Sequence, residues 1–258
     1  MRTTLATLVL LSALPALAQG MEKHWYADVH WYRPSLDGHY DDLSGSSPIS
    51  VDLKDDLALG RQGSHPGFGL EYQGPRFGVE LSRDQQDYSG RNRVSRDITI
   101  DGQTFSASTV VTSSLKATTT TFNWTIRCFT LPEFWIGLDL GGQALETEIR
   151  ASGEDPLSAT TTTADYKTTF PVPQIGPSLG FVAAGGRLVG RGMYHFLAYK
   201  GCTYNNFGAD LRYFPISWLG MRVFAESERF RVPKDSLKNN LDARLDRSGV
   251  GLGIVARF

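Results

Sequence analysis

The most informative absence in this 258-residue chain is that of a long apolar run after its first 18 residues. A helix needs about 20 consecutive apolar residues to cross a lipid bilayer, so no membrane-spanning helix is predicted. The composition points the same way, since 41% of the residues are hydrophobic and 21% are charged. Strands that touch lipid with only one face escape this test, because their polar face lowers the mean hydropathy of every window.

An excess of one charge is missing as well. The chain has 26 Lys and Arg against 27 Asp and Glu. Nucleic-acid-binding domains carry a basic surface, which this balance does not supply. Nucleic acid is therefore excluded as a partner.

Residues 1–18 have the pattern of a secretory signal peptide. Arg2 gives a basic start, an apolar stretch follows, and Ala16 and Ala18 precede Gln19. Small residues at those positions suit signal peptidase. We predict a cleaved signal over residues 1–18 and a single domain over residues 19–258.

The mature chain alternates between apolar and polar residues, and the clearest case is 119–129. Successive side chains of a strand point to opposite faces, so one face here is apolar and the other polar. The apolar face holds Phe122, Trp124, Ile126 and Cys128, and the polar face holds Thr119, Thr121, Asn123, Thr125 and Arg127. This is the pattern of a strand with lipid on one side and a barrel lumen on the other.

About ten segments follow this pattern, and none carries a charge on its apolar face. A charge at mid-membrane on that face would cost about 2–4 kcal/mol. Besides 119–129, the segments are 24–32, 68–73, 77–82, 134–141, 175–181, 188–198, 206–213, 219–226 and 249–258.

Short and long connections alternate between these segments. The short ones lie near 74–75, 131–133, 185–186 and 215–217, and the long ones near 34–64, 85–112, 151–166 and 232–246, with a shorter one near 200–205. Such alternation with an even strand count puts both termini on the periplasmic side. The predicted fold is all-β, an antiparallel up-and-down transmembrane β-barrel of about ten strands, with eight strands as the alternative.

The external part is predicted to be β-rich. The Thr-rich stretches 118–121 and 160–163 favour extended backbone beyond the membrane. Within 85–112, the dipeptide Asp101-Gly102 suits a two-residue hairpin turn over 98–105.

The last strand, 250–258, alternates up to its final residue, Phe258. Together with the signal, the other strands and the loop lengths, it resembles the Gram-negative outer-membrane β-barrel proteins over the whole mature chain. The resemblance implies export through the periplasm to the outer membrane. It also implies that Phe258 is the signal read by the barrel-assembly machinery, and that a monomeric barrel contacts outer-membrane lipid and lipopolysaccharide.

Cys128 and Cys202 are the only two cysteines. An oxidising compartment favours a disulfide. The strand assignment, however, puts Cys128 at the periplasmic rim and Cys202 in an external loop, about 25 Å of apolar band apart. Because a disulfide needs Cα atoms within roughly 7 Å, no bond between them is predicted.

Charged residues and one histidine line the predicted lumen, and two interpretations stay open. They either pair into a plug that makes the barrel rigid, or line a narrow polar pathway. The set is Asp28, Glu71, Glu80, Arg127, Asp139, Arg191, His195, Asp210, Arg212, Arg222, Glu226 and Glu228.

Pro171, Pro173 and Pro177 fall in or near one strand, where proline removes a donor from the ladder. One interpretation places Pro171 and Pro173 above the membrane with a bulge at Pro177. The other is a lateral gap in the wall that admits a lipophilic molecule.

No cofactor, metal site or catalytic residue is predicted. His24, Asp28 and His30 share one face but are spaced too widely for a metal, and Asp52, Asp55 and Asp56 are expected to be a solvated acidic loop. The favoured function is a small channel or transporter for ions or small solutes, lipophilic ones included. The alternatives are a non-conducting surface or structural barrel whose loops bind a partner, and a membrane-embedded hydrolase using His65 or His195.

Overall fold

The computed structural model describes residues 23–42, 49–154, 159–199, 201–233 and 241–258. The predicted signal peptide lies outside these residues. Every regular element in the described part is a β-strand. No described helix has the length and apolarity needed to span a membrane.

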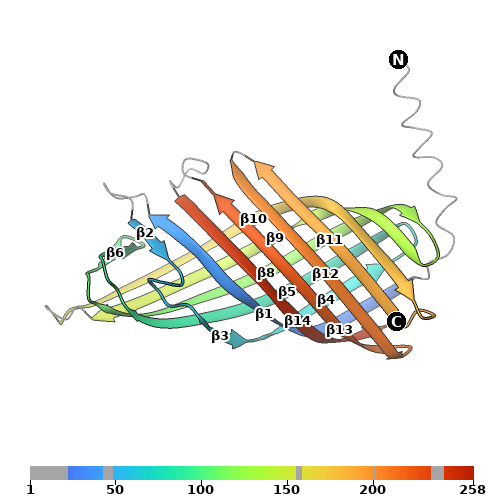
Figure 1. Ribbon diagram of the computed structural model, residues 1–258, viewed down its shortest axis with the longest axis horizontal. Coiled ribbons are helices and arrows are strands. Elements are labelled where there is room, and N and C mark those ends of the chain that lie inside the picture. Colours follow the sequence, from blue (N-terminus) through green and yellow to red (C-terminus); the bar gives the residue numbers. More distant parts are fainter. Residues whose placement is uncertain (1–22, 43–48, 155–158, 200, 234–240) are drawn as a thin grey trace, which may run out of the picture.

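Ten antiparallel strands form a closed ring (Figure 1). In ring order they are β1 (His24–Asp42), β4 (Pro66–Gln73), β5 (Phe77–Arg93), β8 (Val110–Thr130), β9 (Phe134–Glu154), β10 (Thr161–Ala183), β11 (Leu188–Tyr199), β12 (Cys202–Ile216), β13 (Leu219–Val232) and β14 (Leu241–Arg257). The ring closes between β1 and β14, which pair from Tyr26 opposite Arg257 to Asp42 opposite Leu241. This confirms the predicted barrel with ten strands.

A belt of outward apolar side chains surrounds the end of the ring that carries the C-terminus. Trp31 is 44% exposed and Leu252 is 63% exposed, which in a protein of this kind marks contact with lipid. From this belt we define the membrane-spanning segments as 24–33, 66–73, 77–82, 121–129, 134–143, 172–183, 188–197, 206–216, 219–226 and 249–258.

The strands continue well past the belt, so the long loops are shorter than predicted. β1 continues to Asp42, β9 ends only at Glu154, and β10 already begins at Thr161. Above lipid nothing requires an apolar outward face, so apolar alternation does not reveal these strand extensions. The predicted hairpin is confirmed, because β6 (Ile98–Ile100) pairs with β7 (Gln103–Phe105) through Asp101 and Gly102, both at positive φ.

An apolar core fills the extracellular end of the ring. β2 (Ile49–Asp52) and the β6–β7 hairpin lie at this end, far from the C-terminus, and β3 (Arg61–Ser64) lies nearer the middle of the ring's length (Figure 1). The buried apolar side chains of the loops and of the strand tops are Val51, Leu53, Leu57, Leu59, Tyr88, Val94, Ile98, Ile100, Phe105, Val111, Leu115, Ala117, Leu145, Ala151 and Ala164. The extracellular part therefore has a packed interior of its own.

The belt predicts a position-dependent response to charge on β14. Leu252→Arg should lower the free energy of unfolding in lipid vesicles by about 2–4 kcal/mol, because it places a charge in lipid. Ser248→Arg, four residues up the same strand on the same face, should change it little. Urea titration of both refolded variants measures this, and equal losses would contradict the assigned belt.

Candidate functional site: the lumen of the barrel

Arg191 of β11 lies at the centre of the lumen at membrane level. Its guanidinium donates to Glu80 on β5 and to Asp139 on β9, both at 2.8 Å, and to the Thr125 hydroxyl at 3.2 Å. Glu71 lies 3.7 Å from it. The Arg191 side chain is 6% exposed and that of Asp139 is fully buried, so these charges are held by one another and not by bulk water.

Two further arginines continue this network across the lumen. Arg212 contacts Glu71 at 2.5 Å and Asp210 at 2.7 Å. Arg222 binds Asp210 as well, and donates to Asp28 at 2.8 Å.

The ion pairs thus form one continuous chain from β1 to β9. Its members are Asp28, Arg222, Asp210, Arg212, Glu71, Arg191, Glu80 and Asp139. We call this chain the membrane-level network.

Two histidines extend the membrane-level network. His195 Nε2 lies 2.9 Å from Asp139. His30 lies between two carboxylates, with Nδ1 2.6 Å from Asp28 and Nε2 2.8 Å from Asp84. An imidazole whose two nitrogens both face carboxylates is bound best as the doubly protonated cation. His30 therefore offsets part of the excess of carboxylates over arginines.

A second polar layer crosses the lumen just above the belt, and we call it the upper layer. Arg247 binds Glu228, which also accepts hydrogen bonds from Gln143 and Tyr204, each at 2.8 Å. The other side of Arg247 reaches Gln86 on β5 at 3.1 Å. Burial raises the pKa of Glu228, but the charge of Arg247 and these hydrogen bonds outweigh burial and leave the pKa below its usual value.

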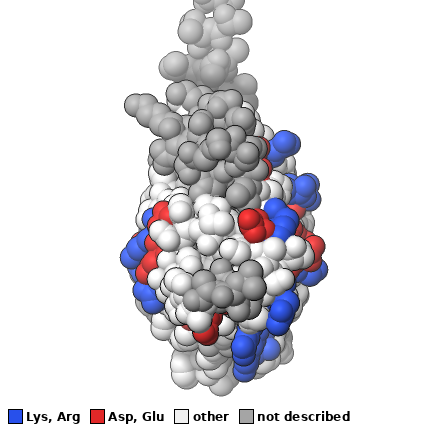
Figure 2. Space-filling view, turned by 90° about the vertical axis from the view of Figure 1, so that its left-hand side faces the viewer, with Lys and Arg blue, Asp and Glu red and all other residues white. Residues whose placement is uncertain are grey.

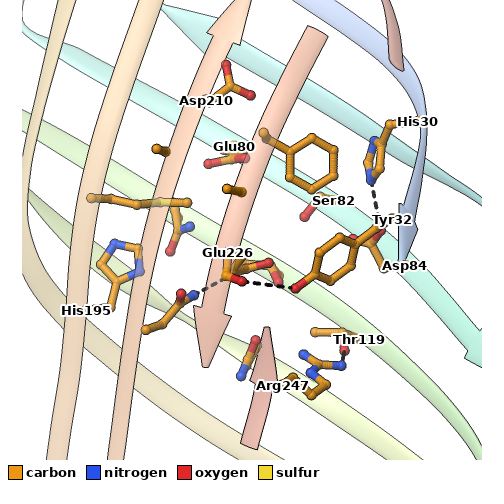
Figure 3. A pocket seen from close by; sticks show the side chains of 18 of the residues that line it. His30, Tyr32, Glu80, Ser82, Asp84, Thr119, His195, Asp210, Glu226 and Arg247 are labelled. Atoms are coloured by element: carbon orange, nitrogen blue, oxygen red, sulfur yellow. Dashed lines mark hydrogen bonds and ion pairs between the residues drawn. The ribbon is translucent and has the colours of Figure 1, made fainter. Parts of the chain in front are cut away.

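A cavity of about 70 Å³ separates the two layers (Figure 3). His30, Asp84, His195 and Glu226 lie on its wall, and Glu226 accepts a hydrogen bond from Asn206 at 2.7 Å. A water molecule needs about 10–15 Å³ of such space. The cavity therefore has room for a few waters.

The structure places every residue of the predicted lumen set on the inner side of the ring. Glu226 lines the cavity, Glu228 belongs to the upper layer, His195 binds Asp139 of the membrane-level network, and Arg127 lies apart, against Gln73 and the Trp135 ring. The other eight belong to the membrane-level network itself: Asp28, Glu71, Glu80, Asp139, Arg191, Asp210, Arg212 and Arg222. Sequence reasoning missed Asp84, Gln143, Tyr204 and Arg247. Continued alternation above the belt, as in Arg247 two residues before Gly249, was the available signal.

The structure also places the predicted metal-binding candidates and the two cysteines. Among the described residues no group of three or more His, Cys, Asp or Glu is arranged to hold a metal ion. Cys128 is exposed near the periplasmic end of β8, and Cys202 begins β12 at the other end of the ring.

The three prolines lie on the outward face of β10, and the predicted bulge at Pro177 is wrong. Pairing of β10 with β9 is continuous. Pairing with β11 skips residues 176–177 but resumes in unchanged register at Ile175 opposite Phe196. The N–H that proline lacks therefore leaves one hydrogen bond between the strands unformed, but no extra residue is inserted into β10.

The wall is nevertheless tight at this seam. A Cβ added to Gly176 would lie 1.8 Å from the backbone oxygen of Tyr194, so the β10 and β11 backbones are in close contact. From Gln174 towards its N-terminus, β10 has no described pairing on its β11 side, although β11 continues to Tyr199. Pro171 and Pro173 lie on this free edge, where proline prevents unwanted strand pairing.

Comparisons with known proteins bear on the fold. No protein-family model matches the chain, and no curated protein matches its sequence. Among solved structures, the outer-membrane protease OmpT of Escherichia coli superposes with a TM-score of 0.64 at 11% identity, covering 93% of this chain and 100% of that one. Ail of Yersinia pestis matches with a TM-score of 0.35 at 13% identity, over 92% of this chain and 100% of its own.

The likeness to OmpT shows that the chain has an outer-membrane β-barrel fold. Together with the apolar belt, it agrees with the predicted location in the outer membrane. At this identity it shows nothing about activity.

The membrane-level network predicts a large penalty for removing Arg191. Arg191→Ala leaves Glu80 and Asp139 buried without their partner, so we expect the free energy of unfolding to fall by about 3–5 kcal/mol. Arg150 is the control, since its side chain is 64% exposed and pairs with Glu148 and Asp165. Arg150→Ala should cost about 1 kcal/mol or less in the same urea titration. Equal effects of the two variants would mean that the lumen charges are solvated.

Tyr88 gives a pH-dependent test of the extracellular core. Its ring lies in that core and its hydroxyl donates to the Pro34 carbonyl at 3.2 Å; burial raises its pKa to about 12. The unfolded chain ionises first, near its ordinary pKa of about 10, so stability is complete below that pH and falls as pH rises towards about 12. The loss over this range should be about 2–3 kcal/mol larger in the wild type than in Tyr88→Phe. Parallel stability curves would show that Tyr88 is solvated.

Proposed function

We propose that this chain, which has the fold of a Gram-negative outer-membrane β-barrel protein, is a closed, non-conducting surface barrel. In this proposal the ring anchors a rigid extracellular β-structure that binds an external partner. The observation that carries the proposal is the continuous membrane-level network across the lumen. This favours the second of the three functions considered from the sequence over the channel.

Three successive layers support closure. An ion crossing the lumen would meet the membrane-level network, then the upper layer around Arg247, then the apolar core under the loops. Breaking a buried ion pair costs several kcal/mol because each charge loses its partner without gaining full hydration. No single rotation of one side chain therefore opens the lumen.

The extracellular part has the properties of a rigid binding platform. Its loops share a core with the strand tops, so they are held in place before a partner arrives. Its outer wall carries alternating charges directly opposite one another, Asp87 against Lys116, Lys116 against Glu148, and Glu148 against Lys167. Seen from the extracellular end, Lys, Arg, Asp and Glu side chains lie mainly along the two sides of the described surface (Figure 2).

A hydrolase receives less support. His195 and Asp139 form a His–Asp pair, but both side chains are buried at 1% exposure or less, where no substrate reaches them. His30 is occupied on both ring nitrogens. The His65–Asp87 pair is accessible, with each side chain 39% exposed. It lies on the wall above the membrane, where Asp87 lines a cleft of about 490 Å³ together with the charged residues Lys116, Glu148 and Arg150.

Conductance across a planar bilayer tests the proposal. The refolded mature chain, residues 19–258, should be electrically silent while its heat-modifiable electrophoretic mobility shows that it is folded. Arg222→Ala should also stay silent, because the upper layer and the apolar core remain. Reproducible, salt-dependent current steps from the wild type, altered in size by Arg222→Ala, would establish an aqueous path and overturn the proposal.

A further inference from the structure

Negative charge exceeds positive charge inside the lumen. The membrane-level network has five carboxylates and three arginines. The other inward charges up to the upper layer are Asp84, Glu226 and Glu228 against Arg127 and Arg247. Carboxylates therefore exceed arginines by three. Protonation of both lumen histidines would offset two of these charges, so at least one carboxylate has no counter-charge.

Glu226 of β13 is the carboxylate that lacks a counter-charge. It lies on the wall of the cavity between the two layers (Figure 3). Among the described residues no Lys, Arg or His nitrogen forms an ion pair with it, and its side chain accepts one hydrogen bond, from Asn206 at 2.7 Å. Arg247 lines the same cavity, but it donates to Glu228 at 2.7 Å and to Gln86 at 3.1 Å.

Two other cationic side chains on the cavity wall, Arg222 and His30, are bound elsewhere as well. Arg222 contacts Asp210 and Asp28. His30 lies between Asp28 and Asp84. Each is already shared by two carboxylates. The charge on β13 is therefore left uncompensated, which is unfavourable for a buried carboxylate.

Three buried acceptor atoms in side chains that line this cavity have no donor within the described part of the chain. They are Asn206 Oδ1, Gln174 Oε1 and His195 Nδ1. Each of these residues is 4% exposed or less. The amide oxygens are identified by the amide nitrogens, which donate to Glu226 and to Asn123. The neutral imidazole has its proton on Nε2, which faces Asp139, so Nδ1 is an acceptor.

The ligand that fits these groups is one small cation. A carboxylate and three acceptors without donors exclude an anion. The cavity of about 70 Å³ compares with about 10–15 Å³ for a water molecule, so it has room for one ion and a few waters. Calcium takes six to eight oxygen ligands, usually with several carboxylates among them. Here Glu226 is the one carboxylate without a counter-charge, which matches a single positive charge.

We propose that the cavity binds one monovalent alkali cation, sodium or potassium. A carboxylate oxygen of Glu226 and the amide oxygens of Asn206 and Gln174 would ligate the ion, and water would complete its coordination shell. The ion would neutralise the remaining carboxylate and satisfy acceptors that have no donor. This inference rests on the closed lumen proposed above, because bulk water in an open lumen would hydrate Glu226.

Neither a proton nor water alone accounts for both observations. A proton on Glu226 would remove its charge but would supply one donor for three acceptors. Water molecules would supply donors but would leave the charge of Glu226 without a counter-charge. A bound cation with its waters accounts for the charge and for the acceptors together.

Urea titration of the refolded mature chain in lipid vesicles tests the proposal. Sodium or potassium chloride would replace choline chloride stepwise at constant ionic strength, because choline is too large for the cavity. The test variant is Glu226→Gln, which removes the charge but keeps an acceptor for Asn206. The matched control is Glu133→Gln, which removes the same charge from an exposed turn between β8 and β9.

A cation that binds only the folded chain raises the folding equilibrium constant as its concentration rises. In the wild type and the control, this constant should increase about tenfold at a sodium or potassium concentration ten times the dissociation constant, a change near 1.4 kcal/mol. Glu226→Gln should not respond. Equal responses of the wild type and Glu226→Gln would show a general salt effect, and an unresponsive wild type would show that Glu226 is protonated or hydrated. Either result overturns the proposal.

The planar-bilayer recording separates this inference from the closed lumen on which it rests. A silent barrel whose stability ignores sodium and potassium overturns the cation site alone. A conducting barrel overturns closure and the cation site together. Heat-modifiable mobility confirms that each variant is folded.

Discussion

The structure depends on one constraint, which is that no charge inside a narrow closed ring can be left without a partner. Lipid forces every backbone group at membrane depth to bond within the ring, and ring closure turns every second side chain inward. With ten strands, the inward side chains nearly fill the space. Arg191 and Arg222 each bind two or more carboxylates from other strands, and Arg212 binds Glu71 of β4 besides Asp210 of its own strand. These contacts tie β1, β4, β5, β9, β11, β12 and β13 together across the lumen.

This cross-linking has consequences outside the membrane. Because the ring is held from within, its strands can continue as a stable wall above the lipid, and the loops can pack an apolar core between them. The wall is uneven, since β11 and β12 end early and leave the upper part of β10 with a free edge. Protection of this free edge explains the prolines of β10 better than a lateral gap does. Below Pro171 and Pro173, the backbones of β10 and β11 are in close contact at Gly176.

The sequence predicts the structure best where the strands touch lipid. Where a strand touches lipid, its outward face must be apolar, so residues such as Phe122 and Leu252 reveal both the strand and the orientation of their neighbours. Above the lipid this constraint ends, so alternation predicts loops where β1 and β9 continue as strands. At the start of β10 only the Thr-rich stretch 160–163 indicates the extended backbone that the structure has. Asp84 on β5 and Arg247 on β14 point inward, but they lie just beyond the predicted lipid-facing segments 77–82 and 249–258 and were not recognised.

The pairings inside the lumen could not be predicted for a different reason. Which carboxylate reaches Arg191 depends on the stagger between strands. Glu80 approaches it from β5 across the ring, and Asp139 from β9, two strands away. Alternation shows only that each residue faces inward. Likewise the bulge expected at Pro177 presumed that a lost hydrogen bond must shift the register, whereas the unbroken pairing with β9 holds β10 in place.

The most direct measurement of the central claim is the reactivity of a cysteine placed in the lumen. Ser178, which donates to Asp139 at 2.7 Å, would be replaced by cysteine in a chain carrying Cys128→Ser and Cys202→Ser. Ser248→Cys on the outer wall is the accessible reference. A closed lumen predicts that a charged, membrane-impermeant thiol reagent modifies the Ser178→Cys protein orders of magnitude more slowly than the reference, from either side of the membrane. Comparable rates would show that water and ions reach the membrane-level network, and the account of a closed barrel would be wrong.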